Sequence, residues 1–118
     1  MKLTFASKKL KKLCETEKQQ QKDLQPKMAQ RLRQRLMELQ AADTLAEISH
    51  LPPARLHELT NRKDVFSVDL QHPMRLLLTP AHEPIPLKED GGVDKSQVTE
   101  IKIMKLEDTH DKKNQRRG

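Results

Sequence analysis

Two polar clusters in this chain of 118 residues hold side chains suited to acid–base chemistry. In the first, residues 56–68, His57 precedes a short polar turn with two adjacent cations, Arg62 and Lys63, and a strand-like run follows. Imidazole transfers protons well near neutral pH because its unperturbed pKa is about 6.5. The first cluster therefore combines a proton-transfer group with cations.

The second cluster, residues 106–110, places Asp108 and His110 two residues apart after the last strand-like run. Arg75 lies between the clusters in the sequence, on the polar face of its own predicted strand. Each of the five histidines, taken alone, is expected to be an ordinary surface side chain. His57 and His110 are candidates because acids or cations accompany them.

The overall charge indicates the class of partner. Lys and Arg number 23 against 17 Asp and Glu, which leaves a net charge of +6. A charge of this sign favours polyanions such as RNA, DNA or an acidic protein over a membrane. Three of the cations, Lys27, Arg31 and Arg35, form a row along one predicted helix. Such a row is either a solvated helix face or a binding surface.

Several classes of site are excluded by residue counts. The only glycines, Gly91, Gly92 and Gly118, do not form a phosphate-binding loop, and no two histidines have the spacing of a helical zinc site. The single cysteine, Cys14, rules out an internal disulfide and a Cys-based zinc cluster. Without Trp or Tyr, rows of stacking aromatics for nucleic acid are absent. We therefore expect no metal, no cofactor and no small-molecule substrate.

The length and hydropathy allow one core and no membrane span. Hydrophobic and charged residues each make up 34% of the chain, so the core is small and the surface heavily charged. No apolar run approaches the roughly 20 residues that cross a bilayer, and the N-terminus has a charged helical pattern. These features predict a cytoplasmic protein with one domain over residues 1–110 and a disordered basic tail over residues 111–118.

The N-terminal half has helical periodicity. After a short strand over residues 2–5, Ser7 is a plausible N-cap for a helix that buries Cys14, and residues 15–23 are expected to connect helices without burying a core. Pro26 suits the first turn of a helix that ends near Gln40. The apolar stripe of this second helix consists of Met28, Leu32, Leu36 and Leu39. A capping box over residues 44–47 predicts one further short turn.

The C-terminal half alternates with a period of two. Two half-buried strands are predicted on either side of the turn at residues 71–73, with weaker evidence for strands over residues 55–59 and 99–106. Residues 80–98 are expected to be a long surface loop. Helices followed by strands predict an α+β fold, in which the N-terminal helices pack on one face of a curved antiparallel or mixed sheet.

At this point the chain resembles the HigB-like toxins of the RelE/ParE superfamily, small basic proteins of bacterial toxin–antitoxin modules. The matching pieces follow the family's order over residues 1–110. They are Gln25-Pro26-Lys27, Arg31-Leu32-Arg33, LHELTNRKDVFSV at residues 56–68, Pro73-Met74-Arg75-Leu76, and LEDTH at residues 106–110. In the family, the last two pieces contain a central WR and a terminal YEDYH.

The resemblance implies a microbial-RNase-like fold and cleavage of mRNA on the ribosome, with a cognate antitoxin as the neutralising partner. Such cleavage needs a base for the 2′-hydroxyl, cations for the charge on phosphorus, and an acid for the leaving 5′-oxygen. By position in the motifs, His57, Asp108 and His110 are the implied acid–base groups. Arg62, Lys63 and Arg75 are the implied phosphate-binding residues, with Lys27, Arg31 and Arg35 as a further RNA-binding row.

One alternative stays open at the level of function. Thr109 stands where the family has Tyr, and threonine neither stacks on a base nor donates a proton readily. This difference favours a non-catalytic protein of the same fold that binds an antitoxin or nucleic acid. The retained histidines favour the enzyme. A DNA-binding antitoxin is disfavoured because no helix-turn-helix pair is visible in the sequence.

Overall fold

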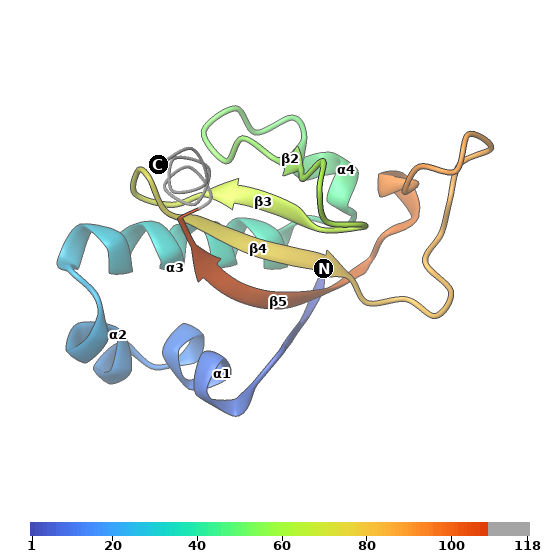
Figure 1. Ribbon diagram of the computed structural model, residues 1–118. Helices are drawn as coiled ribbons and strands as arrows, with labels where there is room; N and C mark the ends of the chain where they lie inside the picture. The colour runs from blue at the N-terminus through green and yellow to red at the C-terminus, as the bar shows by residue number, and fades with distance from the viewer. Residues whose placement is uncertain (109–118) are drawn as a thin grey trace.

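A five-stranded mixed sheet runs through the protein in the order β1-β5-β4-β3-β2 (Figure 1). The computed structural model describes residues 1–108. The strands are β1 (Lys2–Phe5), β2 (His57–Glu58), β3 (Phe66–Asp69), β4 (Arg75–Pro80) and β5 (Glu100–Glu107). β1 pairs with β5 in parallel and all other neighbours are antiparallel. The predicted α+β class and the hairpin between β3 and β4 are confirmed.

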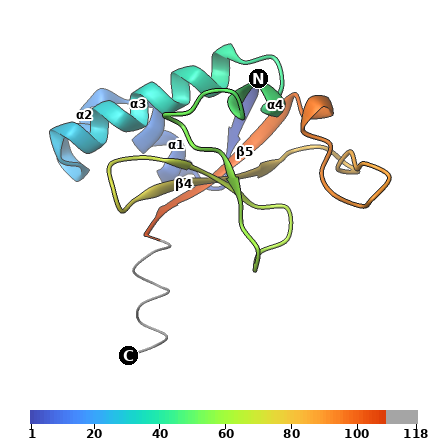
Figure 2. The same ribbon diagram turned by 90° about the horizontal axis from the view of Figure 1, so that it is seen from above.

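The helices lie on one side of this sheet, as Figure 2 shows for α3 and α4. They are α1 (Lys8–Glu15), α2 (Glu17–Asp23), α3 (Pro26–Ala41) and α4 (Leu45–Ile48), and a 3₁₀ turn covers Lys95–Gln97. Ser7 caps α1 as predicted, because its hydroxyl accepts the N–H of Leu10 at 3.1 Å. Pro26 occupies the first turn of α3. Within residues 1–108, no helix has both the length and the apolar character to cross a bilayer.

The core forms between α3 and the sheet. Leu32, Leu36 and Leu39 are buried in one cluster with Phe66 and Leu76, and Met28 packs at its edge. This is the predicted packing of the helical stripe on the strands. Cys14 of α1 joins the same cluster, and burial, followed by the nearby charge of Glu15, raises the pKa of its thiol to about 12. The prediction that Cys14 is a buried thiol is therefore confirmed.

The prediction that residues 15–23 only connect helices is wrong. They contain α2, in which Gln20 is 2% exposed. The Gln20 amide donates to the carbonyl of Cys14 at 3.2 Å and accepts from Arg33 at 2.9 Å. A buried polar group is tolerated when its hydrogen bonds are made. Apolar periodicity could not reveal this helix because its inward residue is an amide.

Three other segments differ from expectation. β2 contains two residues instead of the predicted 55–59. β3 and β4 are more buried than predicted, because Ser67 is 0% and Leu77 1% exposed, whereas Asp69 and Arg75 on the same face are partly exposed. The long segment after β4 places Val93 and Val98 in the core cluster instead of running only along the surface. In the predicted capping box, the Glu47 carboxylate accepts from the N–H of Asp43, and the Thr44 side chain makes no cap bond.

An irregularity in β5 decides which of its side chains face the helices. Leu77 pairs with Lys105 but Leu78 pairs with Ile103, so Met104 is an extra residue in β5. An extra residue of this kind shifts the alternation of side chains by one position. Ile103 therefore shares the core cluster with Leu106, and Glu107 turns to the opposite face of the sheet.

Candidate functional site

The face of the sheet opposite α3 carries most of the predicted site residues and is called the open face here. Because Leu76 and Leu78 point into the core, their neighbours Arg75 and Leu77 point to the open face. Directly paired residues share a face. The pairings therefore add to this face His57, Ser67, Asp69, Lys105 and Glu107.

The segment between β2 and β3 crosses part of the open face (Figure 2). The Thr79 hydroxyl donates to the carbonyl of Asp64 at 2.8 Å. Asp64, and not Asn61, has the left-handed backbone conformation in this segment, with φ of 62°. Leu77 is buried beneath a face that carries mostly polar residues.

An open pocket of about 290 Å³ lies where the residues just before β2 meet β3 and β4, and its lining includes His57 and Arg75. The other described lining residues are Arg55, Leu56 and Asp69. Three of the five side chains carry a charge, and two of those charges are positive. The pocket is therefore suited to an anion.

Asp69 connects the two arginines of the pocket. Its Oδ2 lies 3.5 Å from Nε of Arg55, and its Oδ1 lies 3.6 Å from Nε of Arg75. An Nη atom of Arg75 also approaches the hydroxyl of Ser67 at 3.5 Å. One carboxylate thus faces two guanidinium groups. Both of these ion pairs are longer than a typical charge-assisted hydrogen bond of about 2.8 Å.

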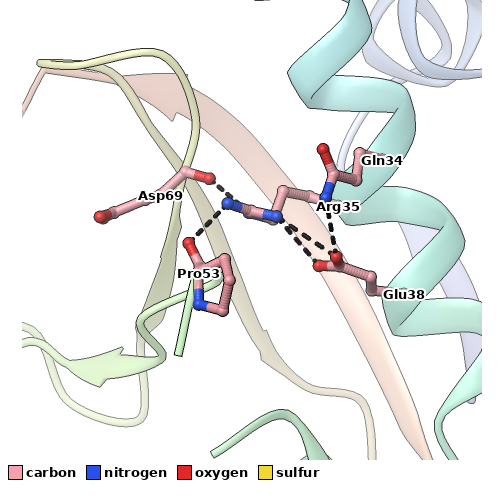
Figure 3. Close-up of polar contacts among 5 residues, drawn as sticks. All are labelled: Gln34, Arg35, Glu38, Pro53 and Asp69. Atoms are coloured by element: carbon pink, nitrogen blue, oxygen red, sulfur yellow. Dashed lines mark hydrogen bonds and ion pairs between the residues drawn. The ribbon is translucent and has the colours of Figure 1, made fainter. Parts of the chain in front are cut away.

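Behind the pocket, Arg35 joins α3 to the backbone of Asp69 (Figure 3). Its Nε donates to the carbonyl of Asp69 at 2.7 Å and its Nη2 donates to the carbonyl of Pro53 at 2.5 Å. The remaining Nη1 pairs with Glu38 at 3.1 Å. Since the side chain is 1% exposed, these bonds satisfy a charge that water does not reach.

The predicted RNA-binding row along α3 is wrong at Arg35. Lys27 and Arg31 are exposed, but Arg35 is buried and holds the structure together. Arg35 follows Leu32 by three positions and precedes Leu39 by four, so it belongs to the stripe that faces the core. The two exposed cations lie on the helix side of the sheet, away from the pocket.

Arg62 is also engaged within the protein. It makes two hydrogen bonds to Glu107, with Nη1 at 3.2 Å from Oε1 and Nη2 at 2.5 Å from Oε2. Lys105 contacts the same carboxylate at 3.2 Å. A phosphate at Arg62 would have to compete with Glu107, whereas Lys63 is exposed to solvent.

The two predicted clusters meet through Arg62 and Glu107, but His57 does not lie beside the second cluster. His57 on β2 is separated from β5 by β3 and β4. Three strand spacings of about 4.8 Å place their backbones about 14 Å apart. Arg75 lies between them, because it lines the pocket with His57 and pairs with Glu107, the residue before Asp108. His110 lies outside the described residues, as do Thr109 and the predicted tail over residues 111–118.

Sequence reasoning missed Arg55 and Asp69. Arg55 was assigned to a strand, yet its backbone is left-handed with φ of 50°, and this turn brings it over Asp69. Asp69 is a polar position at the end of the alternating run before residues 71–73, and alternation alone does not mark it as a site residue. The two prolines at residues 52 and 53 were a signal for a bend before Arg55, but they do not indicate where its side chain points.

Searches against protein-family models, curated proteins and solved structures found no match to this chain.

Proposed function

We propose that this protein is the toxin of a bacterial type II toxin–antitoxin module and that it cleaves mRNA on the ribosome. The proposal includes a RelE/ParE-like, microbial-RNase-like fold, a cytoplasmic location and a cognate antitoxin as partner. The family motifs in the sequence support it, as does the α+β architecture with helices on one face of a mixed sheet.

The observation that carries the proposal is the pocket in which His57 and Arg75 meet. Cleavage of RNA through its 2′-hydroxyl forms a new bond between that oxygen and phosphorus and breaks the bond to the 5′-oxygen. A base takes the proton from the 2′-hydroxyl, and an acid gives a proton to the leaving oxygen. The charge on the phosphate oxygens is balanced by cations.

The residues can be assigned to these roles by their positions across the sheet. Arg75 in the middle would bind the reacting phosphate. His57 on one side and Asp108 on the other would serve the entering and leaving oxygens, which lie roughly in line on opposite sides of phosphorus. His110 keeps the acid–base role that the family motif implies. The wide separation between His57 and β5 suits two distinct proton-transfer groups better than one shared group.

A non-catalytic binding protein is the second candidate. Within residues 1–108, no hydrogen bond or ion pair holds the imidazole of His57, which is exposed. A catalytic histidine is usually oriented by a partner. Together with Thr109 in the terminal motif, this observation favours a protein that binds an antitoxin or RNA without cleaving it.

Inducible expression in a bacterium tests the proposal, with growth and the 5′ ends of cellular mRNA as readouts. The parent chain should arrest growth and produce new mRNA ends. His57→Ala should reduce cleavage by about 10²–10⁴-fold, and Arg75→Gln by about 10²–10³-fold. His50→Ala removes an exposed histidine that does not line the pocket and should behave as the parent. Growth arrest without new mRNA ends would favour the binding protein.

A further inference from the structure

Asp69 occupies an unusual position because both its backbone and its side chain are engaged. Its N–H donates to the carbonyl of Ala54 at 2.8 Å, and its carbonyl accepts from Arg35 at 2.7 Å. These bonds fix the main chain of β3 against the bend at residues 52–55. Since Arg35 also binds the carbonyl of Pro53, the bend that carries Arg55 is held from the same point.

The side chain of Asp69 contacts different residues from its backbone. Its two oxygens each face the Nε atom of one arginine, Arg55 on one side and Arg75 on the other. An arginine that contacts a carboxylate through Nε still has terminal nitrogens for a second anion. At 3.5 and 3.6 Å these ion pairs are loose, so a second anion can loosen or replace them at little cost.

Arg55 has two further marks of a binding residue. Its side chain is 70% exposed, in contrast to 28% for Arg75, so it is accessible to a large ligand. Its φ of 50° is unfavourable for a residue other than glycine, asparagine or aspartate. Non-glycine residues held in this region are frequent at ligand-binding sites, where the surrounding structure maintains the strain.

We propose that Arg55 and Arg75 together bind one phosphate group of single-stranded RNA and that Asp69 is a positioning residue, whose carboxylate holds the two guanidinium groups on either side of it when the site is empty of RNA. This inference rests on the proposed function only for the identity of the ligand. Arg55 becomes the second phosphate-binding residue. The carboxylate of Asp69 competes with the incoming phosphate and so weakens binding of small anions.

The direct test is a titration of the full chain, followed by NMR of the arginine Nε–H groups. Inorganic phosphate should shift the signals of Arg55 and Arg75 with one common dissociation constant, and the signal of Arg33, which bonds to Gln20, should not follow. Movement of the Arg75 signal alone, or of neither signal, would overturn the shared site.

A non-cleavable 2′-O-methyl RNA oligonucleotide distinguishes an RNA backbone from free phosphate. Arg55→Gln and Arg75→Gln should each weaken oligonucleotide binding by about tenfold, as expected for a charged hydrogen bond. Each should also lower the slope of log affinity against log salt. Because the two arginines share one phosphate, the double variant should lower the slope by about 0.7 in total, the value for one phosphate contact on a single strand. Lys22→Gln removes an exposed cation of α2 that belongs to none of the proposed binding residues, so it is the control and should change neither. An unchanged slope in Arg55→Gln would contradict the proposal, because lost packing alone does not alter counterion release.

Asp69→Asn isolates the carboxylate, since the backbone bonds to Arg35 and Ala54 remain. This variant should bind inorganic phosphate severalfold more tightly than the parent, because a competing negative charge is gone. Unchanged or weaker phosphate binding by a folded Asp69→Asn variant would exclude the positioning role. Since none of these measurements uses toxicity, phosphate binding without mRNA cleavage would contradict the proposed function alone. Toxicity of the parent without a common phosphate response at Arg55 and Arg75 would contradict this inference alone.

Discussion

Arg35 and Arg55 both contact Asp69, one through its backbone and the other through its side chain, and their surroundings differ sharply. Arg35 approaches from α3, is 1% exposed and uses its three nitrogens in bonds of 2.5 to 3.1 Å. Arg55 approaches from the open face, is 70% exposed and makes one ion pair at 3.5 Å. Its backbone is also left-handed.

This contrast separates a structural arginine from a binding one. A buried guanidinium is stable only when carbonyls and a carboxylate surround it, so its position is determined by the fold. A solvated guanidinium beside a shared carboxylate contributes little to stability and remains able to bind an anion. The same division holds for the whole sheet, whose helix-covered face forms the core and whose open face carries the charged pocket.

The reactivity of the Cys14 thiol tests how well the helices exclude solvent from the core on their side of the sheet. With a pKa raised to about 12 by burial, the thiol should react with a thiol reagent at pH 8 at least about a thousandfold more slowly in the folded protein than in denaturant, because reaction requires opening. As control, Lys63→Cys in a Cys14→Ser background should react rapidly. Comparable rates for the two thiols would show that α1 does not seal the core.

The same pKa predicts a pH dependence of stability. Because the folded thiol binds its proton more tightly than the unfolded one, the folded state holds more protons between pH 9 and pH 12. The free energy of unfolding should therefore fall as the pH rises above about 9, and Cys14→Ser should remove this part of the decline. Chemical denaturation at several alkaline pH values measures it.

Replacement of the buried arginine should have the next largest effect. Arg35→Met removes the donors to Pro53 and Asp69 and the partner of Glu38, and it should lower the free energy of unfolding by about 3–5 kcal/mol. Arg31→Met on the exposed side of α3 should change it by less than about 0.5 kcal/mol. If urea denaturation gave the same loss of unfolding free energy for both variants, the distinction between structural and solvated arginines would be wrong.

Truncation of a leucine in the apolar stripe of α3 measures how much the packing of this helix on the sheet contributes to stability. Leu36→Ala should cost about 2–5 kcal/mol because Leu36 packs in the core cluster between α3 and the sheet. Met37→Ala, one residue further along the helix, removes a side chain of a residue that is 64% exposed and should be nearly neutral. A loss at Met37 as large as at Leu36 would mean that α3 packs through another face.

The smallest expected effect concerns the strain at Arg55. Arg55→Gly and Arg55→Gln both remove the guanidinium, but only glycine adopts a φ of 50° without strain. The glycine variant should therefore be about 1 kcal/mol more stable than the glutamine variant in denaturation experiments. Both should lose RNA affinity equally. Equal stability of the two variants would remove the argument from strain, while unequal affinity would point to a backbone contribution to binding.

Local patterns predicted much of the frame of the fold. Ser7 before an apolar stripe predicted the start of α1, and Pro26 with leucines at helical spacing predicted α3. The alternation on either side of residues 71–73 predicted the hairpin of β3 and β4. These features depend on neighbouring residues, so their information is contained in short windows of sequence. The helix α2 was missed because its buried side chain, Gln20, is polar.

The site was predicted less completely because it depends on contacts between distant segments. His57 and Arg75 were identified as candidates and line one pocket. The burial of Arg35 was readable in its spacing from Leu32 and Leu39, but its charge suggested a surface residue. The bonds that keep that charge in the core come from Pro53 and Asp69, 18 and 34 residues away.

The sequence by itself determined the basic charge, the helix that supports the sheet and the residue types available for proton transfer. Only the tertiary structure decided which cations are structural and which can bind a ligand. The strand order places two strands between His57 and β5, and the extra residue Met104 turns Glu107 toward Arg62. Strand order and bulges arise from the pairing of segments far apart in the chain, where the backbone hydrogen bonds of one strand select the register of the next.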